Sequence, residues 1–272
     1  PSVGTTSMNV NFGQLNNKGL DLSLSAQIIR NKDWFWSMTL TGGHVMDQIR
    51  KISQGLKNDI DNPYDSSKPK ILFVEGGSQY DIYAMRSAGI DPATGKEIFI
   101  KKNGEYTFKY DENERVAVGN TNPILQGSWM NTVRYKGFSI SLATSYTFGS
   151  DYYNSTLKNK VENIDLDYNV DRRVFTDRWK QPGDHTRFLG IGTSSSSSQY
   201  SERFVEKRNE LYISSIQVMY DFAPKAITRL GLRKLAIGFG LSDIAHISTV
   251  KFERGTDYPY CRGINLIFRP TF

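Results

Sequence analysis

Hydrophobic and polar residues alternate along most of this chain, and a period of two predicts β-strands with two different faces. From Leu20 to Ile28 the even positions are apolar, and after a short turn the even positions from Trp34 to Leu40 are apolar again. Later segments repeat the pattern, so seven strands are predicted, at residues 20–28, 34–40, 129–135, 138–148, 212–222, 235–241 and 264–272. Most approach the ~10 residues with which a tilted strand crosses a bilayer.

The connections between these strands alternate between short and long. Short turns are expected at 31–33, at Lys136-Gly137 and at 223–233, and long polar segments at 44–126, 150–210 and 242–260. Tight turns on one side and long loops on the other are typical of outer-membrane β-barrels. Within the loops, residues 78–100 predict either another strand pair or loop structure, and the serine run 194–198 predicts a flexible insert.

The apolar positions of the strands carry no charge, although 23% of the chain is charged. Lipid enforces such an exclusion, because a Lys or Arg at the bilayer midplane costs about 2–4 kcal/mol. The core of a soluble β-sandwich would enforce it too, and this alternative stays open at this point. The residues expected to face lipid are Leu20, Leu22, Leu24, Ile140, Leu142, Val218, Ile237, Phe239, Leu266 and Phe268.

Aromatic residues near the strand ends favour the membrane interpretation. The chain has 15 Tyr, 15 Phe and 4 Trp, and many of them flank the predicted turns and loops. Barrels carry girdles of aromatic side chains at both membrane interfaces. The residues expected in these girdles are Trp34, Trp36, Tyr135, Phe138, Tyr146, Phe148, Tyr220 and Phe222.

The composition of the 272 residues excludes several other classes. The 34 basic and 28 acidic residues give a net charge of +6 without a clustered basic run, so no nucleic-acid partner is expected. The single cysteine, Cys261, excludes an internal disulfide and a multi-cysteine metal site. A mean hydropathy of −0.47 suggests a soluble protein, but in a barrel this average combines a lipid-facing surface with a polar lumen and aqueous loops.

Seven strands do not close a barrel comfortably, and open sheet edges are not tolerated in lipid. Either a strand before Leu15 completes a small eight-stranded barrel, or the chain is the C-terminal part of a larger one. The opening Pro1-Ser2-Val3-Gly4 has neither an initiating Met nor a signal-peptide pattern. This favours an interior or processed beginning.

Several short motifs resemble those of one family in their order and spacing. Asn17-Lys18-Gly19-Leu20-Asp21 resembles Asn-Lys-Gly-Val-Glu at the start of a strand, and residues 88–95 resemble a Gly-(Ile/Leu)-Asp-Pro-x-Thr-Gly turn. Further likenesses are Gly119 to Pro123, Tyr135-Lys136-Gly137-Phe138, Asp177-Arg178-Trp179, Arg203-Phe204-Val205-Glu206, and Tyr258-Pro259 with Arg262. Together they resemble the C-terminal barrel of the SusC/RagA family, TonB-dependent outer-membrane transporters of Bacteroidota. One departure is that the family usually has Asn-Leu where this chain has Asp243-Ile244.

The resemblance implies an all-β fold, an antiparallel transmembrane β-barrel of 22 strands with a plugged lumen. Residues 1–272 would form roughly its last third as one barrel region, with the plug and N-terminal regions not present in this chain. The implied function is TonB-dependent import of bulky nutrients, oligosaccharides or peptides, across the outer membrane. The implied partners are a SusD-like lipoprotein over the long loops, the TonB complex acting through the plug, the barrel assembly machinery, and membrane lipid and lipopolysaccharide.

The residues supply few candidates for chemistry. Oxygen ligands at alternate positions make a weak calcium candidate of Asp165, Asp167, Asn169 and Asp171, although the glycine of an EF-hand loop is missing, and a solvated acidic loop is the alternative. The three histidines lie far apart, and no nucleophile elbow or phosphate-binding loop occurs. We therefore expect no cofactor and no enzymatic activity.

Two further expectations concern contacts. The terminal Phe272 closes an alternating strand and, in such families, is expected to be recognised during barrel assembly; simple contact with lipid is the alternative. Tyr152, Tyr153, Arg178 and Trp179 suit stacking on sugars or holding peptides, or else they pack within their own loop. A non-transporting SusC-like scaffold and a soluble carbohydrate-binding β-protein remain alternative functions.

Overall fold

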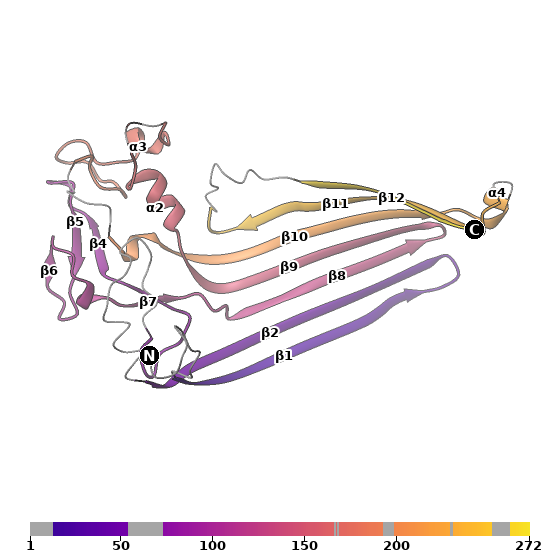
Figure 1. The fold of residues 1–272 in the computed structure, drawn as a ribbon, viewed down its shortest axis with the longest axis horizontal. Coiled ribbons are helices and arrows are strands. Elements are labelled where there is room, and N and C mark those ends of the chain that lie inside the picture. The colour runs from indigo at the N-terminus through magenta and orange to yellow at the C-terminus, as the bar shows by residue number, and fades with distance from the viewer. Residues whose placement is uncertain are drawn as a thin grey trace, which may run out of the picture. The chain divides into compact units, whose positions relative to one another are not determined.

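The computed structural model describes residues 13–53, 73–165, 167, 169–192, 199–228, 231–251 and 262–272. Seven long strands form one antiparallel sheet in the order β1-β2-β8-β9-β10-β11-β12 (Figure 1). Their bounds are β1 Gly13–Arg30, β2 Trp34–Ile52, β8 Leu125–Tyr135, β9 Phe138–Tyr153, β10 Val205–Asp221, β11 Lys234–Ser248 and β12 Gly263–Thr271. The seven predicted strands are confirmed, and β2 pairs with β8 although a long segment separates them in the chain.

Six of the seven strands are longer than the alternation predicted, and β12 has the predicted length. β1, β2, β9, β10 and β11 have 15 to 19 residues each, whereas β8 has 11 and β12 has 9. Backbone pairing continues past the alternating stretches into segments where the period of two is lost. The pattern therefore marks the apolar part of each strand and not its full length.

The short connections are built by local hydrogen bonds. In the β1–β2 turn, the Asn31 side chain accepts the backbone N–H groups of Asp33 and Trp34, at 3.1 and 2.7 Å. In the β8–β9 turn, Lys136 adopts a left-handed conformation with φ of 51°. The connection from β10 to β11, expected as a plain turn, contains the short helix α4 (Pro224–Ile227). These turns, α4 and the C-terminus lie at the same end of the sheet (Figure 1).

One irregularity interrupts the register between β10 and β11. The pairing shifts between Ile213 and Ser215, so that β11 has one residue more than β10 in this region. Asp243 lies in the bulge with φ of 54° and accepts a hydrogen bond from the Tyr212 hydroxyl. Asn and Asp tolerate this left-handed conformation better than other side chains, so Asp243 fits where the family usually has Asn.

The long segments fold into smaller elements. β3 (Asp81–Ala84) pairs with β7 (Val116–Asn120), and β4 (Arg86–Ile90), β5 (Glu97–Ile100) and β6 (Tyr106–Thr107) form a second small sheet. Residues 78–100 thus contain short strands within loop structure. The other elements are η1 (Glu112–Glu114), α2 (Ser155–Val161), α3 (Arg173–Thr176) and η2 (Glu202–Phe204). The serine run 194–198, the Tyr258-Pro259 motif and Cys261 lie outside the described residues.

The chain divides into two compact units. One comprises residues 1–18, 45–122 and 153–205, and we call it the loop body; the other comprises 19–44, 123–152 and 206–272, and we call it the sheet unit. The loop body has its own small core of Leu157, Val161, Phe188 and Phe204, against which Tyr153 packs. No helix in the described ranges is long and apolar enough to cross a membrane.

Candidate functional site

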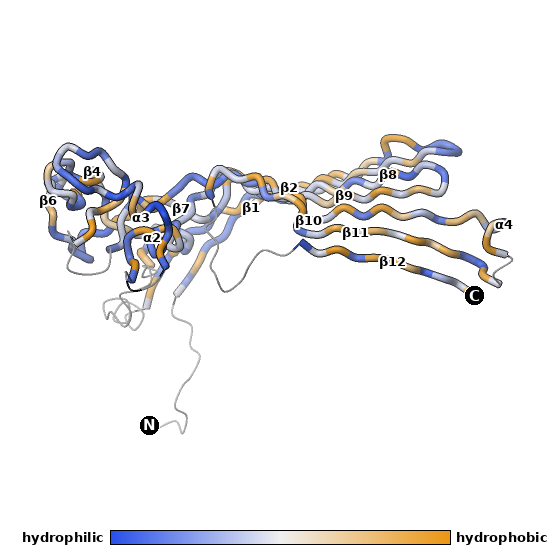
Figure 2. The backbone as a smooth tube through the Cα atoms, turned by 90° about the horizontal axis from the view of Figure 1, so that it is seen from above, coloured by the Kyte–Doolittle hydropathy of each residue, from blue (hydrophilic) through white to orange (hydrophobic). Residues whose placement is uncertain are grey.

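One face of the sheet unit presents apolar side chains that no other part of the described structure covers. Directly opposed residues of antiparallel strands point to the same face. The register places Val218, Phe239 and Leu266 in one row, and Ile237 beside Phe268 in the next. Leu266 is 85% exposed and Leu20 on β1 is 75% exposed. We call this surface, which includes all ten residues expected to face lipid, the apolar face; hydrophobic and hydrophilic residues alternate along its strands (Figure 2).

Aromatic side chains border the apolar face at the turn end. Trp34 and Tyr135 have ring centroids 4.3 Å apart, and Phe138 and Tyr220 have theirs 4.6 Å apart. Phe222 continues the series at 4.9 Å from Tyr220. The sequence predicts aromatics at these positions, and the structure joins them into a row along the sheet. Phe272, directly after β12, lies at this end and is 80% exposed.

Tyr146 and Phe148 form an aromatic pair farther along β9, with centroids 5.6 Å apart. The Tyr146 hydroxyl donates a hydrogen bond of 2.7 Å to the Thr41 carbonyl on β2, two strands away. Tyr146 reaches it by crossing Gly127, where an added Cβ would overlap the Thr41 oxygen and lie 2.6 Å from the Tyr146 hydroxyl. Glycine is therefore required at 127 for this aromatic to lie flat against the sheet.

Trp36 lies one step farther from the turns than Trp34 and is half-buried. Its indole N–H donates to the Asn131 side chain at 3.3 Å. Asn131 is a polar residue within the apolar face, opposite both Met38 and Leu142. The bond from Trp36 satisfies an acceptor that would be costly to leave unpaired in an apolar environment.

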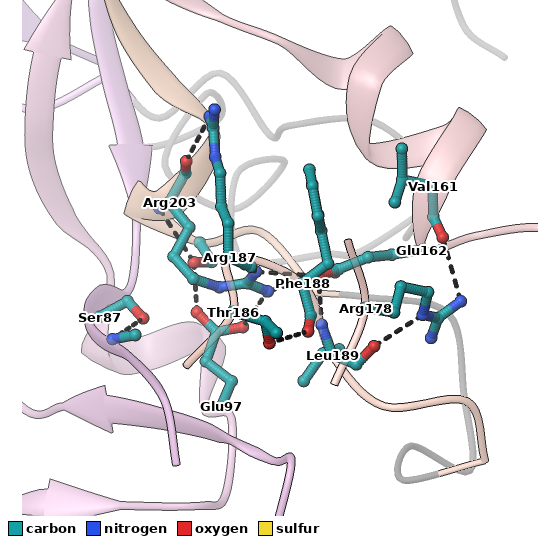
Figure 3. Close-up of polar contacts among 12 residues, drawn as sticks. Ser87, Glu97, Val161, Glu162, Arg178, Thr186, Arg187, Phe188, Leu189 and Arg203 are labelled. Carbon is teal, nitrogen blue, oxygen red and sulfur yellow. Dashed lines mark hydrogen bonds and ion pairs between the residues drawn. The ribbon is translucent and has the colours of Figure 1, made fainter. Parts of the chain in front are cut away.

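A buried ionic cluster holds the loop body together (Figure 3). Arg203 on η2 forms ion pairs with Glu97 at 2.7 Å and with Glu162 at 2.9 Å, and the side chains are 6%, 4% and 0% exposed. Glu97 also accepts a hydrogen bond from the Ser201 hydroxyl, and Glu162 accepts the Leu189 N–H at 2.9 Å. Burial alone lowers the pKa of Arg203, but the bonds and charges of Glu97 and Glu162 outweigh it and raise the pKa.

Arg178 belongs to the same buried region. Its guanidinium donates to the carbonyl oxygens of Leu189 and Val161 at 2.6 and 3.0 Å (Figure 3), and to that of Gly190 at 3.0 Å. Burial lowers the pKa of Arg178, and the charge of Glu162 opposes that shift. Of the two roles expected for Arg178, the structure shows packing within the loop.

Trp179 connects two segments of the loop body. Its indole N–H donates to the Pro92 carbonyl at 2.9 Å, and its ring lies against Gly95, where an added Cβ would overlap the ring carbons. Gly95 closes the Asp91–Gly95 turn with φ of 67°. The Thr94 hydroxyl bond to Asp91 lowers the pKa of that carboxyl and fixes the turn. Trp179 is therefore a packing residue of this turn.

The two neighbouring tyrosines have different surroundings. Tyr153 packs near Tyr200 and Phe204, at centroid distances of 5.6 and 6.3 Å. Tyr152 belongs to the sheet unit, at the end of β9, and is half-buried. The structure thus brings Tyr153, Arg178 and Trp179 into the packing of the loop body, and leaves Tyr152 outside that cluster.

An open groove of about 440 Å³ lies on the loop body. Leu157 and Phe188 form its apolar floor, and the polar residues around them are Arg173, Thr176, Asp177, His185, Thr186 and Arg187. Apolar contact surface with a few hydrogen-bonding groups is typical of sites for organic ligands. Sequence reasoning missed this groove, because its residues come from α2, α3 and a separate loop and follow no spacing that a motif could reveal.

The structure does not gather the calcium candidates into a cluster. Asp171 binds Arg173 at 2.7 Å, and this contact holds the pKa of Asp171 well below its usual range. Asp165 accepts the backbone N–H of Asp167 at 3.0 Å, and Asp165, Asp167 and Asn169 are exposed. Over the described part of the chain, no three His, Cys, Asp or Glu side chains are arranged to hold a metal ion.

Comparisons with known proteins agree with the architecture. None of the known family profiles matches the chain. The chain is 23% identical over 287 residues to TonB-dependent receptor P39 of Formosa agariphila, a match that covers 89% of this chain and 27% of the receptor. TonB-dependent receptor P3 of the same organism is 24% identical over 173 residues, covering 57% of this chain and 17% of that protein.

Solved structures show the same fold. A structure of the RagAB peptide transporter matches with a TM-score of 0.72 and 19% identity over 92% of this chain, and a RagAB peptide importer in the closed-closed state matches with a TM-score of 0.69 and 20% identity over 88%. This chain spans 28% and 27% of those chains. The matched proteins are described as receptors, a transporter and an importer, and RagA is SusC-like. In sequence and fold, this chain resembles a barrel portion of a SusC/RagA-type TonB-dependent receptor.

Proposed function

We propose that this chain is part of the barrel wall and loops of an outer-membrane importer of bulky nutrients, oligosaccharides or peptides. The observation that carries the proposal is the apolar face with its aromatic row. Large apolar side chains such as Leu266 and Leu20 are exposed over a continuous surface, which a soluble domain avoids and a bilayer requires. The similarity to TonB-dependent receptors supports energy-coupled import.

In this proposal the loop body contacts the nutrient through its groove. The polar groups of Thr176, Asp177, His185 and Thr186 provide hydrogen bonds, and Leu157 and Phe188 provide apolar contact. Arg173 contributes little net charge, because Asp171 pairs with it. The groove thus suits neutral or zwitterionic ligands with many hydroxyl or amide groups, a description that fits both sugars and peptides.

The proposed partners follow from the similarity. The RagAB structures contain a RagA-like receptor paired with RagB, which is SusD-like. We propose a SusD-like lipoprotein over the loops of this chain, and a TonB complex that acts on a plug elsewhere in the full-length protein. Tyr152, at the end of β9, remains a candidate contact to the ligand or to this lipoprotein.

Uptake of labelled substrates tests the proposal. Cells lacking the full-length protein would be complemented with the wild type, with Asp177→Ala/His185→Ala, or with a matched control, Lys101→Ala, on the β5–β6 hairpin outside the groove. Uptake of labelled oligosaccharides or oligopeptides should require the wild-type gene and stop when the proton gradient is dissipated. The groove variant should lower uptake at least fivefold, and the control should not. Unchanged uptake in cells without the gene would instead assign this protein a scaffolding role.

A further inference from the structure

The turn end of the sheet unit concentrates positive charge. Within the described turn-end residues 30–34, 134–138, 221–228, 231–234 and 268–272, eight Lys and Arg accompany only two Asp. These turn-end residues have a net charge of +6, the same as the formal net charge of the whole chain. The remainder of the chain is therefore balanced, and the basic excess belongs to this one edge.

Backbone hydrogen bonds join the turns into one continuous edge. The Lys136 N–H donates to the Asp33 carbonyl at 2.9 Å, which links the β1–β2 and β8–β9 turns. The Asp221 N–H donates to the Gly137 carbonyl at 2.8 Å, and the Arg233 N–H donates to the Thr271 carbonyl at 2.8 Å. The cations of successive turns thus follow one another along the edge of the sheet.

Four of these cations lie at the same end of the sheet as the aromatic row. Arg30 ends β1, Lys32 and Lys136 lie in the two turns, and Lys225 lies on α4; all four are exposed. We call them the basic rim. The Lys136 ammonium lies 5.2 Å from the centre of the Tyr135 ring, within the aromatic row itself. No member of the rim forms a salt bridge with a carboxylate of the described residues.

We propose that the basic rim binds the phosphate groups of anionic phospholipids, such as phosphatidylglycerol, in the leaflet at the turn end. This inference rests on the membrane placement proposed above. Aromatic side chains at a membrane interface lie at headgroup depth, so cations beside them meet lipid phosphates. The turn side of outer-membrane barrels faces the periplasm, where the leaflet is made of phospholipid. Each cation near an anionic membrane surface strengthens binding about fivefold.

Lipid retention by the full-length protein tests the rim. Two proteins would be reconstituted in nanodiscs of phosphatidylethanolamine with equal parts of phosphatidylglycerol and phosphatidylcholine. They are the wild type and the triple variant Lys32→Gln/Lys136→Gln/Lys225→Gln. Native mass spectrometry after release into detergent would give the ratio of retained phosphatidylglycerol to phosphatidylcholine. The triple variant should lower this ratio by one to two orders of magnitude. A matched variant, Lys101→Gln/Lys102→Gln/Lys109→Gln, removes the same charge from the loop body and should leave the ratio unchanged.

The outcomes separate this inference from the proposed function. Equal ratios for the wild type and the rim variant would overturn the rim as a lipid site, while normal insertion would leave the membrane placement intact. The rim would also be overturned as a phospholipid site if retention of added lipid A, and not of phosphatidylglycerol, depended on it. A protein that does not associate with nanodiscs at all would overturn the membrane placement and the rim together.

Discussion

Leu142→Arg tests the membrane placement most directly, because Leu142 lies near the middle of the apolar face. On β9 it stands between Phe138 and Phe148, the aromatic residues near the two borders of that face. At about 3.4 Å per residue and a tilt of about 40°, these aromatics are ~26 Å apart along the membrane normal, and Leu142 lies ~3 Å from the midplane. An arginine at this depth costs about 2–4 kcal/mol, which lowers the ratio of inserted to uninserted protein about 30- to 900-fold.

The assay is insertion of the full-length protein into lipid vesicles, followed by heat-modifiable gel migration. The matched control is Ser141→Arg, because Ser141 is the preceding residue of the same strand and points to the opposite face, where its hydroxyl lies 3.4 Å from that of Thr132. In the proposed barrel, an arginine on that face would enter the polar lumen and should cost little. Equal insertion of both variants, or equal failure of both, would refute the assignment of the two faces.

Three other changes probe separate parts of the structure. Arg203→Met leaves two glutamates buried without their cation and should destabilise the loop body by about 3–5 kcal/mol, measured as loss of protease resistance. Glu97→Gln should destabilise it less, because an amide still accepts hydrogen bonds. Gly127→Val should block folding by steric overlap, whereas Gly240→Ala, where an added Cβ meets only ordinary contacts of 3.7 Å or more, should be tolerated when insertion is compared. Because the pKa of Asp171 is lowered, its ion pair stabilises the loop body above about pH 4, and this stabilisation is lost as the pH falls further. Asp171→Asn should therefore make the melting temperature of the loop body less dependent on pH below about pH 4.

The sheet could be predicted from the sequence because its signal is local. Alternation from Leu20 to Ile28, or from Phe138 to Phe148, reports two unlike faces without knowledge of any partner strand. The aromatic row could also be predicted from the sequence, because Trp34, Tyr135 and Tyr220 each lie beside a predicted turn. The full length of the strands could not be predicted, because their extensions beyond the alternating stretches carry no alternation.

The loop body could not be predicted in the same way, because its contacts are distant in sequence. Arg203 meets Glu162 across 41 residues and Glu97 across 106, and no periodicity connects them. Residue type suggested either ligand contact or loop packing for Arg178, and sequence could not show that this side chain is buried and donates to three backbone carbonyls. The contacts of a charged loop residue depend on how the loop folds, so its residue type alone does not predict them.

The ionic cluster and the groove share one segment, and this makes them energetically coupled. Arg203 donates to the Arg187 carbonyl at 2.7 Å, and Arg187 and the adjacent Phe188 line the groove. Buried ion pairs of this kind add geometric specificity more readily than net stability. Arg203→Met should therefore weaken ligand binding although Arg203 does not contact the ligand. The loss of binding free energy caused by His185→Ala should be smaller in the Arg203→Met background than in the wild type. A double-mutant cycle of binding constants should show this difference as at least about 0.5 kcal/mol. Additive effects would show that the groove keeps its shape independently of the cluster.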